Sequence, residues 1–109
     1  MDRTFFHSET TAFEKTGEGV QRKILSYGEA LMSVEVHFKA GASGEIHTHP
    51  HTQLTYVLEG EFVFTVGDNT ETVHKGDTIY MLPNIPHGCT CTKSGILLDL
   101  FTPMREDFI

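Results

Sequence analysis

The sequence predicts an all-β protein, folded as one antiparallel sandwich or barrel. Apolar and polar residues alternate from Leu31 onward, so that Met32, Val34, Val36 and Phe38 share one face of a strand. Turn residues interrupt this alternation every 8–12 residues or so, at intervals of roughly the length expected for short antiparallel strands. No segment shows the period of an amphipathic helix. Closing such a sheet into a barrel also removes its exposed edges.

The limits of each strand follow from the alternation and from the turn residues that flank it. The predicted strands are 23–25, 31–38, 52–58, 61–66, 70–74, 78–82, 87–92 and 96–102. The predicted turns and irregular segments are 12–19, 39–44, 59–60, 67–69, 75–77, the proline corner 83–86 and the tail 103–109.

Length and charge limit what the chain can do. A chain of 109 residues predicts a single domain, residues 1–109, with one core and room for one ligand-sized cavity. With 8 basic and 15 acidic residues the formal charge is −7, which argues against nucleic acid as a partner. An anionic substrate therefore needs local positive charge at its binding site.

The sequence also predicts where the chain works. It has no run of about 18 apolar residues, so no membrane-spanning segment is expected. The polar start lacks the apolar stretch of a signal peptide, which predicts a cytoplasmic protein. Cys89 and Cys91 are poorly spaced for a disulfide with each other, and they are expected to be reduced thiols.

Four residues form a predicted metal site. His47 and His49 lie two apart, which on a strand places both side chains on one face. Gln53 has the same parity after a bend at Pro50, and His87 begins a distant strand. Imidazole nitrogens suit ions such as Ni, Zn, Mn and Fe, and an amide oxygen can be a fourth, weaker ligand. The pattern predicts one divalent transition metal ion on these four side chains and leaves its identity open.

The remaining histidines are expected to have ordinary roles. His7, His37 and His74 should lie at the surface or make a simple hydrogen bond. His51 shares parity with His49 but follows the bend, so it is expected at the rim of the site or behind a ligand.

These residues resemble the two sequence motifs of the cupin superfamily, the first over residues 41–60 and the second over 76–87. The resemblance implies a small jelly-roll barrel, or double-stranded β-helix, and a homodimer. Gln53 stands where the first motif usually has Glu. Four neutral ligands would leave the ion its full charge, which makes it a stronger Lewis acid. Other departures from the motifs are Pro83, Asn84 and Cys91.

A narrower resemblance comes from the segments 47–62, 82–89 and 98–108. They look like a group of cupins that linearises 4,5-unsaturated monouronates released from pectin and alginate. The resemblance implies that Asp99, Phe101 and Arg105 join the metal as the active site. From the residues alone, Asp99 could instead be a structural carboxylate bonded to backbone or to Arg105, and Arg105 could be solvated.

Other functions on the same fold stay open at this point. A metal-dependent cupin oxygenase would consume oxygen and prefer iron, and Gln53 in place of Glu argues mildly against it. A keto-sugar isomerase could use the same metal site. A sugar-sensing cupin would need a DNA-binding partner. The pattern Asp-x-Phe-x-x-x-Arg over 99–105 favours uronate linearisation, because the rival functions do not require it.

Overall fold

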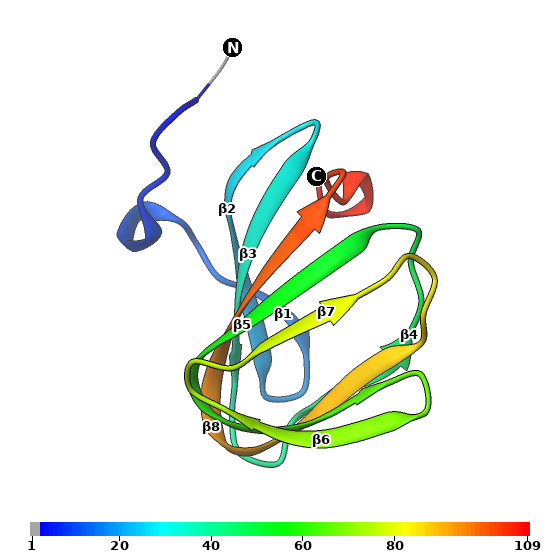
Figure 1. Cartoon of the computed structure of the whole chain (residues 1–109). Helices are drawn as coiled ribbons and strands as arrows, with labels where there is room; N and C mark the ends of the chain where they lie inside the picture. The colour runs from blue at the N-terminus through cyan, green and yellow to red at the C-terminus, as the bar shows by residue number, and fades with distance from the viewer. Residues whose placement is uncertain (1–2) are drawn as a thin grey trace.

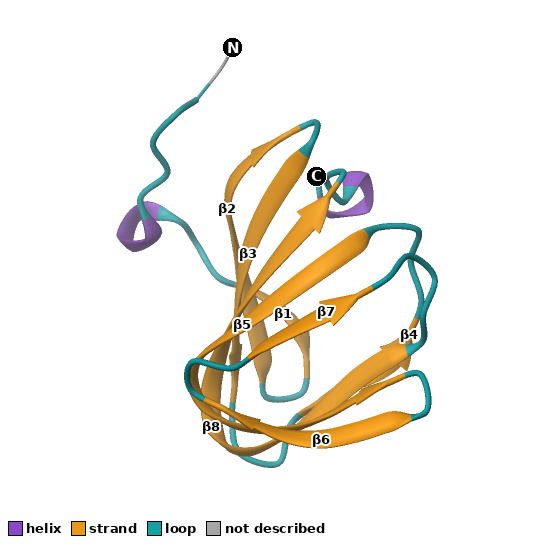
Figure 2. Cartoon of the chain, viewed as in Figure 1, coloured by secondary structure: helices purple, strands orange, loops and turns teal. Residues whose placement is uncertain are grey.

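Strands dominate the fold, with only two short 3-10 helices among the residues described (Figure 2). The structure is a computed structural model and describes residues 3–109. Within those residues, no helix has both the length and the hydropathy needed to cross a membrane. The elements are η1 (Ser8–Thr10), β1 (Glu14–Gly17), β2 (Val20–Gly28), β3 (Leu31–Phe38), β4 (Ser43–His47), β5 (Thr52–Val66), β6 (Asn69–His74), β7 (Thr78–Met81), β8 (His87–Thr102) and η2 (Glu106–Phe108).

The two long strands β5 and β8 each belong to two half-sheets (Figure 1). They pair antiparallel with each other over most of their length. The first part of β5 also pairs with β7 and its second part with β6. The second part of β8 pairs with β3, and its first part pairs with β4. The half-sheets β2-β3-β8-β5-β7 and β4-β8-β5-β6 form a jelly-roll barrel, which confirms the predicted fold class.

The bend between the half-sheets lies at two facing glycines. Gly60 has a φ of +85°, and a Cβ on it would lie 2.5 Å from the Cα of Gly95. A Cβ on Gly95 would overlap the carbonyl oxygen of Glu59. Only glycine fits at either position, because the two backbones approach so closely. The pairing of β5 with β8 shifts its register at this place, as expected for a bulged, sharply bent ladder.

This bend overturns one prediction. Residues 59–60 do not make a tight turn, and the predicted strands 52–58 and 61–66 are one strand, β5. In the same way, 87–92 and 96–102 join into β8. Glycine interrupts the alternating pattern in both cases, but the partner strand follows the same bend and keeps the ladder paired.

Two strands were also missed by the sequence pattern. β1 lies within the segment 12–19, and β4 begins inside the predicted turn 39–44. Both have mostly exposed side chains, so they carry no apolar alternation. β2 also extends well beyond 23–25, because it pairs with β1 on one side and β3 on the other.

The barrel interior holds two apolar clusters. Of the four residues predicted to share one face of β3, Met32, Val34 and Phe38 are buried and Val36 is partly buried. The smaller cluster joins Met32 and Val34 to Phe101. The larger cluster consists of Val20, Phe38, Val57, Phe62, Phe64, Met81, Cys91 and Leu97.

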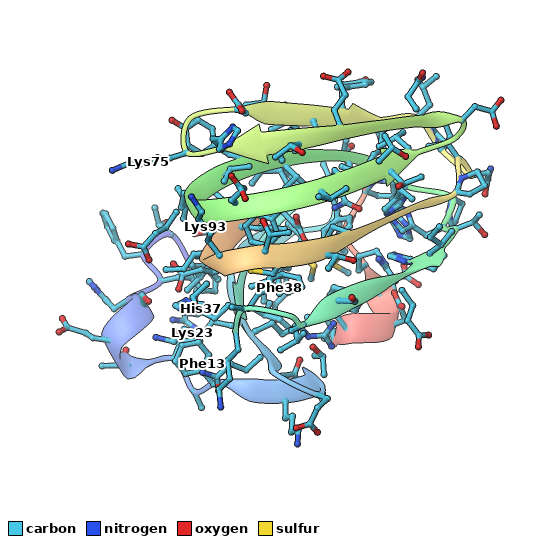
Figure 3. The ribbon with its side chains drawn as sticks, turned by 90° about the horizontal axis from the view of Figure 1, so that it is seen from below. Phe13, Lys23, His37, Phe38, Lys75 and Lys93 are labelled. Atoms are coloured by element: carbon cyan, nitrogen blue, oxygen red, sulfur yellow. The ribbon has the colours of Figure 1, made fainter. Side chains whose placement is uncertain are left out.

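The N-terminal segment is fixed to the outer side of β2 and β3. Lys23 Nζ donates to the carbonyl of Ser8 at 2.9 Å and lies 4.4 Å from the centroid of the Phe13 ring. The Phe13 ring meets the His37 ring edge-on at 4.8 Å, and Figure 3 shows these three side chains together. His37 Nε2 also lies 2.7 Å from Glu35 Oε2, so this histidine has the ordinary role expected of it.

Candidate metal centre and active site

A cavity of about 280 Å³ between the two apolar clusters gathers most of the predicted site. His49 does not line it but lies directly behind, with its ring centroid 4.8 Å from that of His87. The predicted residues that line the cavity are His47 at the end of β4, Gln53 on β5, His87, Asp99 and Phe101 on β8, and Arg105 in the tail.

Two loops bring the histidines together. The loop 48–51 follows β4, and the loop 82–86 precedes β8. The backbone N–H of Asn84 donates to the carbonyl of His49 at 2.8 Å, which ties the loops to each other. Asn84 has a φ of 63°, a left-handed conformation that asparagine tolerates. The prediction that His47 and His49 share a strand is wrong, because β4 ends at His47 and the bend carries His49 inward.

The three histidines form a compact group of possible ligands. The ligand atoms of His47, His49 and His87 all lie within 4.8 Å of one another. Burial lowers the pKa of His87 to about 4 and also lowers the pKa of His49 below its ordinary value. Both rings are therefore neutral at pH 7, which is the form that binds a metal.

Backbone carbonyls fix the orientation of two of these rings. His47 Nδ1–H donates to the carbonyl of Glu45 at 2.8 Å, and His87 Nδ1–H donates to that of Ile85 at 3.0 Å. Each ring then offers an unprotonated Nε2, and backbone carbonyls commonly orient metal-bound histidines in this way. In the described chain, Nε2 of His87 is buried without a hydrogen-bond partner. Such an atom is costly unless something binds it, so the residues fit a divalent transition metal ion.

Gln53 is placed where it could complete the group. Its Oε1 lies 2.9 Å from Nε2 of His49. This contact is a hydrogen bond that brings the amide oxygen beside the ring nitrogen, and both atom types are ones that could hold a divalent ion.

Asp99 lines the same cavity as His47 and His87. Its Oδ1 accepts a hydrogen bond of 2.7 Å from the hydroxyl of Thr55. Burial raises the pKa of Asp99 to about 6, against the opposing effect of hydrogen bonds from Thr55 and Gln53. A carboxyl with a pKa near neutral can both accept and donate a proton. Arg105 does not pair with Asp99; it makes a two-point ion pair with Asp107, at 3.0 Å and 2.8 Å.

The tail contributes aromatic and cationic groups to the lining of the cavity. Phe108 lies between two guanidinium groups, 3.8 Å from Arg22 and 4.2 Å from Arg105, measured from each Cζ to the ring centroid. Its ring also meets Phe101 edge-on at 5.8 Å. Arg105 thus keeps one guanidinium edge on Asp107 and one face on the aromatic wall.

Three neighbours of the site remain. Cys89 lines the cavity, and burial raises the pKa of its thiol to about 12, so it is neutral and unreactive. Cys91 is buried in the core, and both cysteines are free, as predicted. His51 lies beside the ligand group rather than in it, with its ring 5.3 Å from that of His49.

Sequence reasoning missed Thr55, Arg22 and Phe108. Thr55 could have been found, because it shares parity with Gln53 and is a polar residue at an inward position of β5. Arg22 and Phe108 gave no such signal, since only the folded tail brings Phe108 against β2.

The raised pKa of Asp99 predicts a pH-dependent stability of the metal-free protein. The unfolded chain releases this proton near the ordinary value of 3.8, whereas the folded protein holds it up to about pH 6. Stability from this group is therefore complete below pH 3.8 and is lost as pH rises through 6. Asp99→Asn cannot ionise. Between pH 3.8 and pH 6, we therefore expect the free energy of unfolding of Asp99→Asn to rise by up to about 3 kcal/mol relative to that of the parent. Urea unfolding of chelated samples measures this difference. Asp68→Asn, at an exposed turn, is the control; a pH-independent difference would contradict the prediction.

Comparisons with known proteins agree with the fold. The family described as the cupin domain matches residues 34–101. The pectin degradation protein KdgF of Dickeya dadantii is 36% identical, over 98% of this chain and 99% of its own length. Among solved structures, an RmlC-like cupin from Shewanella frigidimarina has a TM-score of 0.95 at 39% identity, covering 99% of this chain and 97% of that one. KdgF from Halomonas sp. has a TM-score of 0.94 at 30% identity, covering 99% and 100%. The protein described here belongs to the cupin family.

Proposed function

We propose that this cupin is a metal-dependent enzyme that linearises 4,5-unsaturated monouronates. One observation carries the proposal: a single cavity of about 280 Å³ is lined by His47 and His87 of the histidine group and by Asp99, Phe101 and Arg105. The volume suits a ligand of monosaccharide size. The full-length similarity to proteins named KdgF supports the same choice.

The reaction is an isomerisation without an external co-reactant. The substrate is a cyclic hemiacetal with a C4=C5 enol ether and a carboxylate on C5. Loss of the C1 hydroxyl proton allows the bond between C1 and the ring oxygen to break, which gives an aldehyde and an enolate at C5. Protonation at C4 then gives the 5-keto acid. The proton removed from O1 can be the proton delivered to C4, so one carrier is enough.

Each residue has a role in this scheme. Asp99 accepts the O1 proton and returns it to C4, for which its pKa of about 6 is suited. Phe101 packs on the sugar and excludes water. His47, His49, Gln53 and His87 would hold one divalent ion among Ni, Zn, Mn and Fe. Such an ion supplies a Lewis acid for the developing enolate oxygen or the carboxylate.

Arg105 is proposed to bind the substrate carboxylate. Asp107 occupies its Nε and Nη2, which leaves the edge formed by Nη1 and Nη2 for a two-point contact. Arg105→Lys keeps the positive charge but loses the pair of N–H groups that makes the two-point contact. We expect KM to rise about 10-fold or more with a smaller change in kcat, because a charge-assisted hydrogen bond contributes about 1.5–3 kcal/mol. Steady-state kinetics of the parent and the variant measures both constants. An unchanged KM would contradict the binding of the substrate carboxylate by Arg105.

The test of the function uses an unsaturated monouronate freshly made by a lyase. Loss of the conjugated ultraviolet absorbance is followed with and without the metal-replete protein, and NMR identifies the product. We expect acceleration over the spontaneous rate, abolished by a chelator. A rate equal to the spontaneous one overturns the proposal, and oxygen consumption would point to an oxygenase instead.

Three further expectations belong to this proposal. We expect action on uronates derived from alginate as well as from pectin, in the cytoplasm, and as a homodimer. The outer face of β5 and β8 supports dimerisation, since it presents Leu54, Leu98 and Leu100 beside Tyr56, which is 40% exposed. Sedimentation of the purified protein measures the oligomeric state directly.

A further inference from the structure

Thr55 is a polar side chain in the most buried part of the barrel. It follows Gln53 and precedes Val57 on the inward side of β5, and none of its surface is exposed. A buried hydroxyl without hydrogen bonds costs free energy, and an apolar side chain of the same shape would not. Its presence here points to a role for the hydroxyl itself.

The hydroxyl connects the proposed metal ligands to Asp99. Gln53 Nε2 donates to Thr55 Oγ1 at 3.0 Å, and Thr55 Oγ1 donates to Asp99 Oδ1 at 2.7 Å. Thr55 and Asp99 are direct cross-strand partners in the pairing of β5 with β8. Together with the 2.9 Å contact between His49 and Gln53, the bonds form a continuous chain from His49 to Asp99.

Counting protons fixes the direction of this chain. A hydroxyl has one proton, and an ionised carboxylate can only accept. The proton of Thr55 therefore goes to Asp99, and its oxygen accepts from Gln53. The amide nitrogen of Gln53 must then face Thr55, which turns its oxygen toward His49. A glutamate at position 53 would put a second carboxylate against the same hydroxyl, whose one proton cannot serve both acceptors.

We propose that Thr55 is a positioning residue that turns the Gln53 oxygen toward the histidines and holds Asp99 by Oδ1, leaving Oδ2 to exchange protons with the substrate. The part concerning Asp99 rests on the proposed function; the part concerning Gln53 concerns metal binding alone. Loss of the hydroxyl frees the amide to rotate and the carboxylate to move, so both metal affinity and turnover should fall.

The test compares Thr55→Val, which keeps the shape and removes the hydroxyl, with Thr55→Ser, which keeps the hydroxyl. Affinity for Zn²⁺ is measured by competition with a chromogenic chelator, and kcat and KM are measured at saturating metal. Thr55→Val should weaken Zn²⁺ binding about 10-fold or more and lower kcat by about 10–100-fold, the range seen when groups behind a metal ligand are removed. KM should change little, because Arg105 is untouched. Thr55→Ser should stay near the parent in both measurements.

Thr65→Val is the matched control, since Thr65 lies on the same strand and, among the described residues, its hydroxyl is hydrogen-bonded to Thr70 alone, at 2.9 Å. The proposal is overturned if Thr55→Val keeps the parent affinity and turnover, or if Thr55→Ser loses as much as Thr55→Val. If Thr55→Val does not fold, Thr55→Ala is compared with Thr55→Ser by the same criteria. Should the parent fail to accelerate linearisation, the proposed function fails, and the Zn²⁺ affinities alone decide the role of Thr55.

Discussion

Asp99→Asn is expected to lower kcat for linearisation by about 100-fold or more, the contribution typical of a positioned proton-transfer group. The amide keeps the size of the carboxyl and can still accept from Thr55 through its oxygen, as Oδ1 does in the parent. It cannot take the O1 proton, so ring opening loses its base. The same substitution should stabilise the metal-free protein above pH 6, so lost activity would accompany gained stability.

The measurement is kcat for parent, Asp99→Asn and Asp68→Asn, each loaded with metal to the same content. Asp68 lies in the exposed turn between β5 and β6, and its variant should match the parent. Turnover by Asp99→Asn within a few-fold of the parent would remove Asp99 from proton transfer. Its remaining role would then be the structural one, as a partner of Thr55.

His87→Ala is expected to abolish metal binding and, with it, catalysis. His87 is 3% exposed and lines the cavity. Its Nδ1–H donates to the backbone carbonyl of Ile85, and its buried Nε2 has no hydrogen-bond partner among the described residues. Removing a group behind a ligand already lowers metal affinity about 10–100-fold, so loss of the ligand itself should exceed about 100-fold. At metal concentrations that just saturate the parent, the variant should therefore be nearly free of metal and inactive.

Metal content after dialysis and chelator competition measure this loss. His74→Ala is the control, because His74 lies on β6 and contacts Glu61 at 3.0 Å, remote from the ligand group. Equal metal content in His87→Ala and His74→Ala would contradict the predicted site. Parent protein treated with a chelator should reproduce the His87→Ala phenotype.

The parts of the fold that sequence predicts best are those with one buried face. Met32, Val34 and Phe38 alternate with polar residues, and their burial follows from that pattern alone. The sequence could not predict that β5 is one continuous strand, because a glycine at position 60 is compatible with either a turn or a bend. The choice depends on Gly95, a residue distant in sequence whose strand bends alongside. The sequence did not predict β1 and β4, because their side chains are mostly exposed and apolar residues therefore do not alternate with polar ones.

The candidate site divides in the same way. The family resemblance selected Asp99 and Phe101, which both line the cavity, and motif spacing selected the histidines. His49 lies beside His47 and His87, but a loop presents it rather than the strand that its parity with His47 indicates. The link from Gln53 through Thr55 to Asp99 depends on the register of β5 against β8, which no local pattern specifies.

The bend of β8 at Gly95 determines how far apart His87 and Asp99 lie. His87 and Asp99 both belong to β8, where twelve residues of straight strand would hold them about 40 Å apart. Yet both line one small cavity. The curvature of a single strand therefore sets the separation of His87 from Asp99 and, on the proposed function, the size of sugar that fits between them. Larger or smaller substrates would call for a different curvature of β8 rather than for different chemical groups.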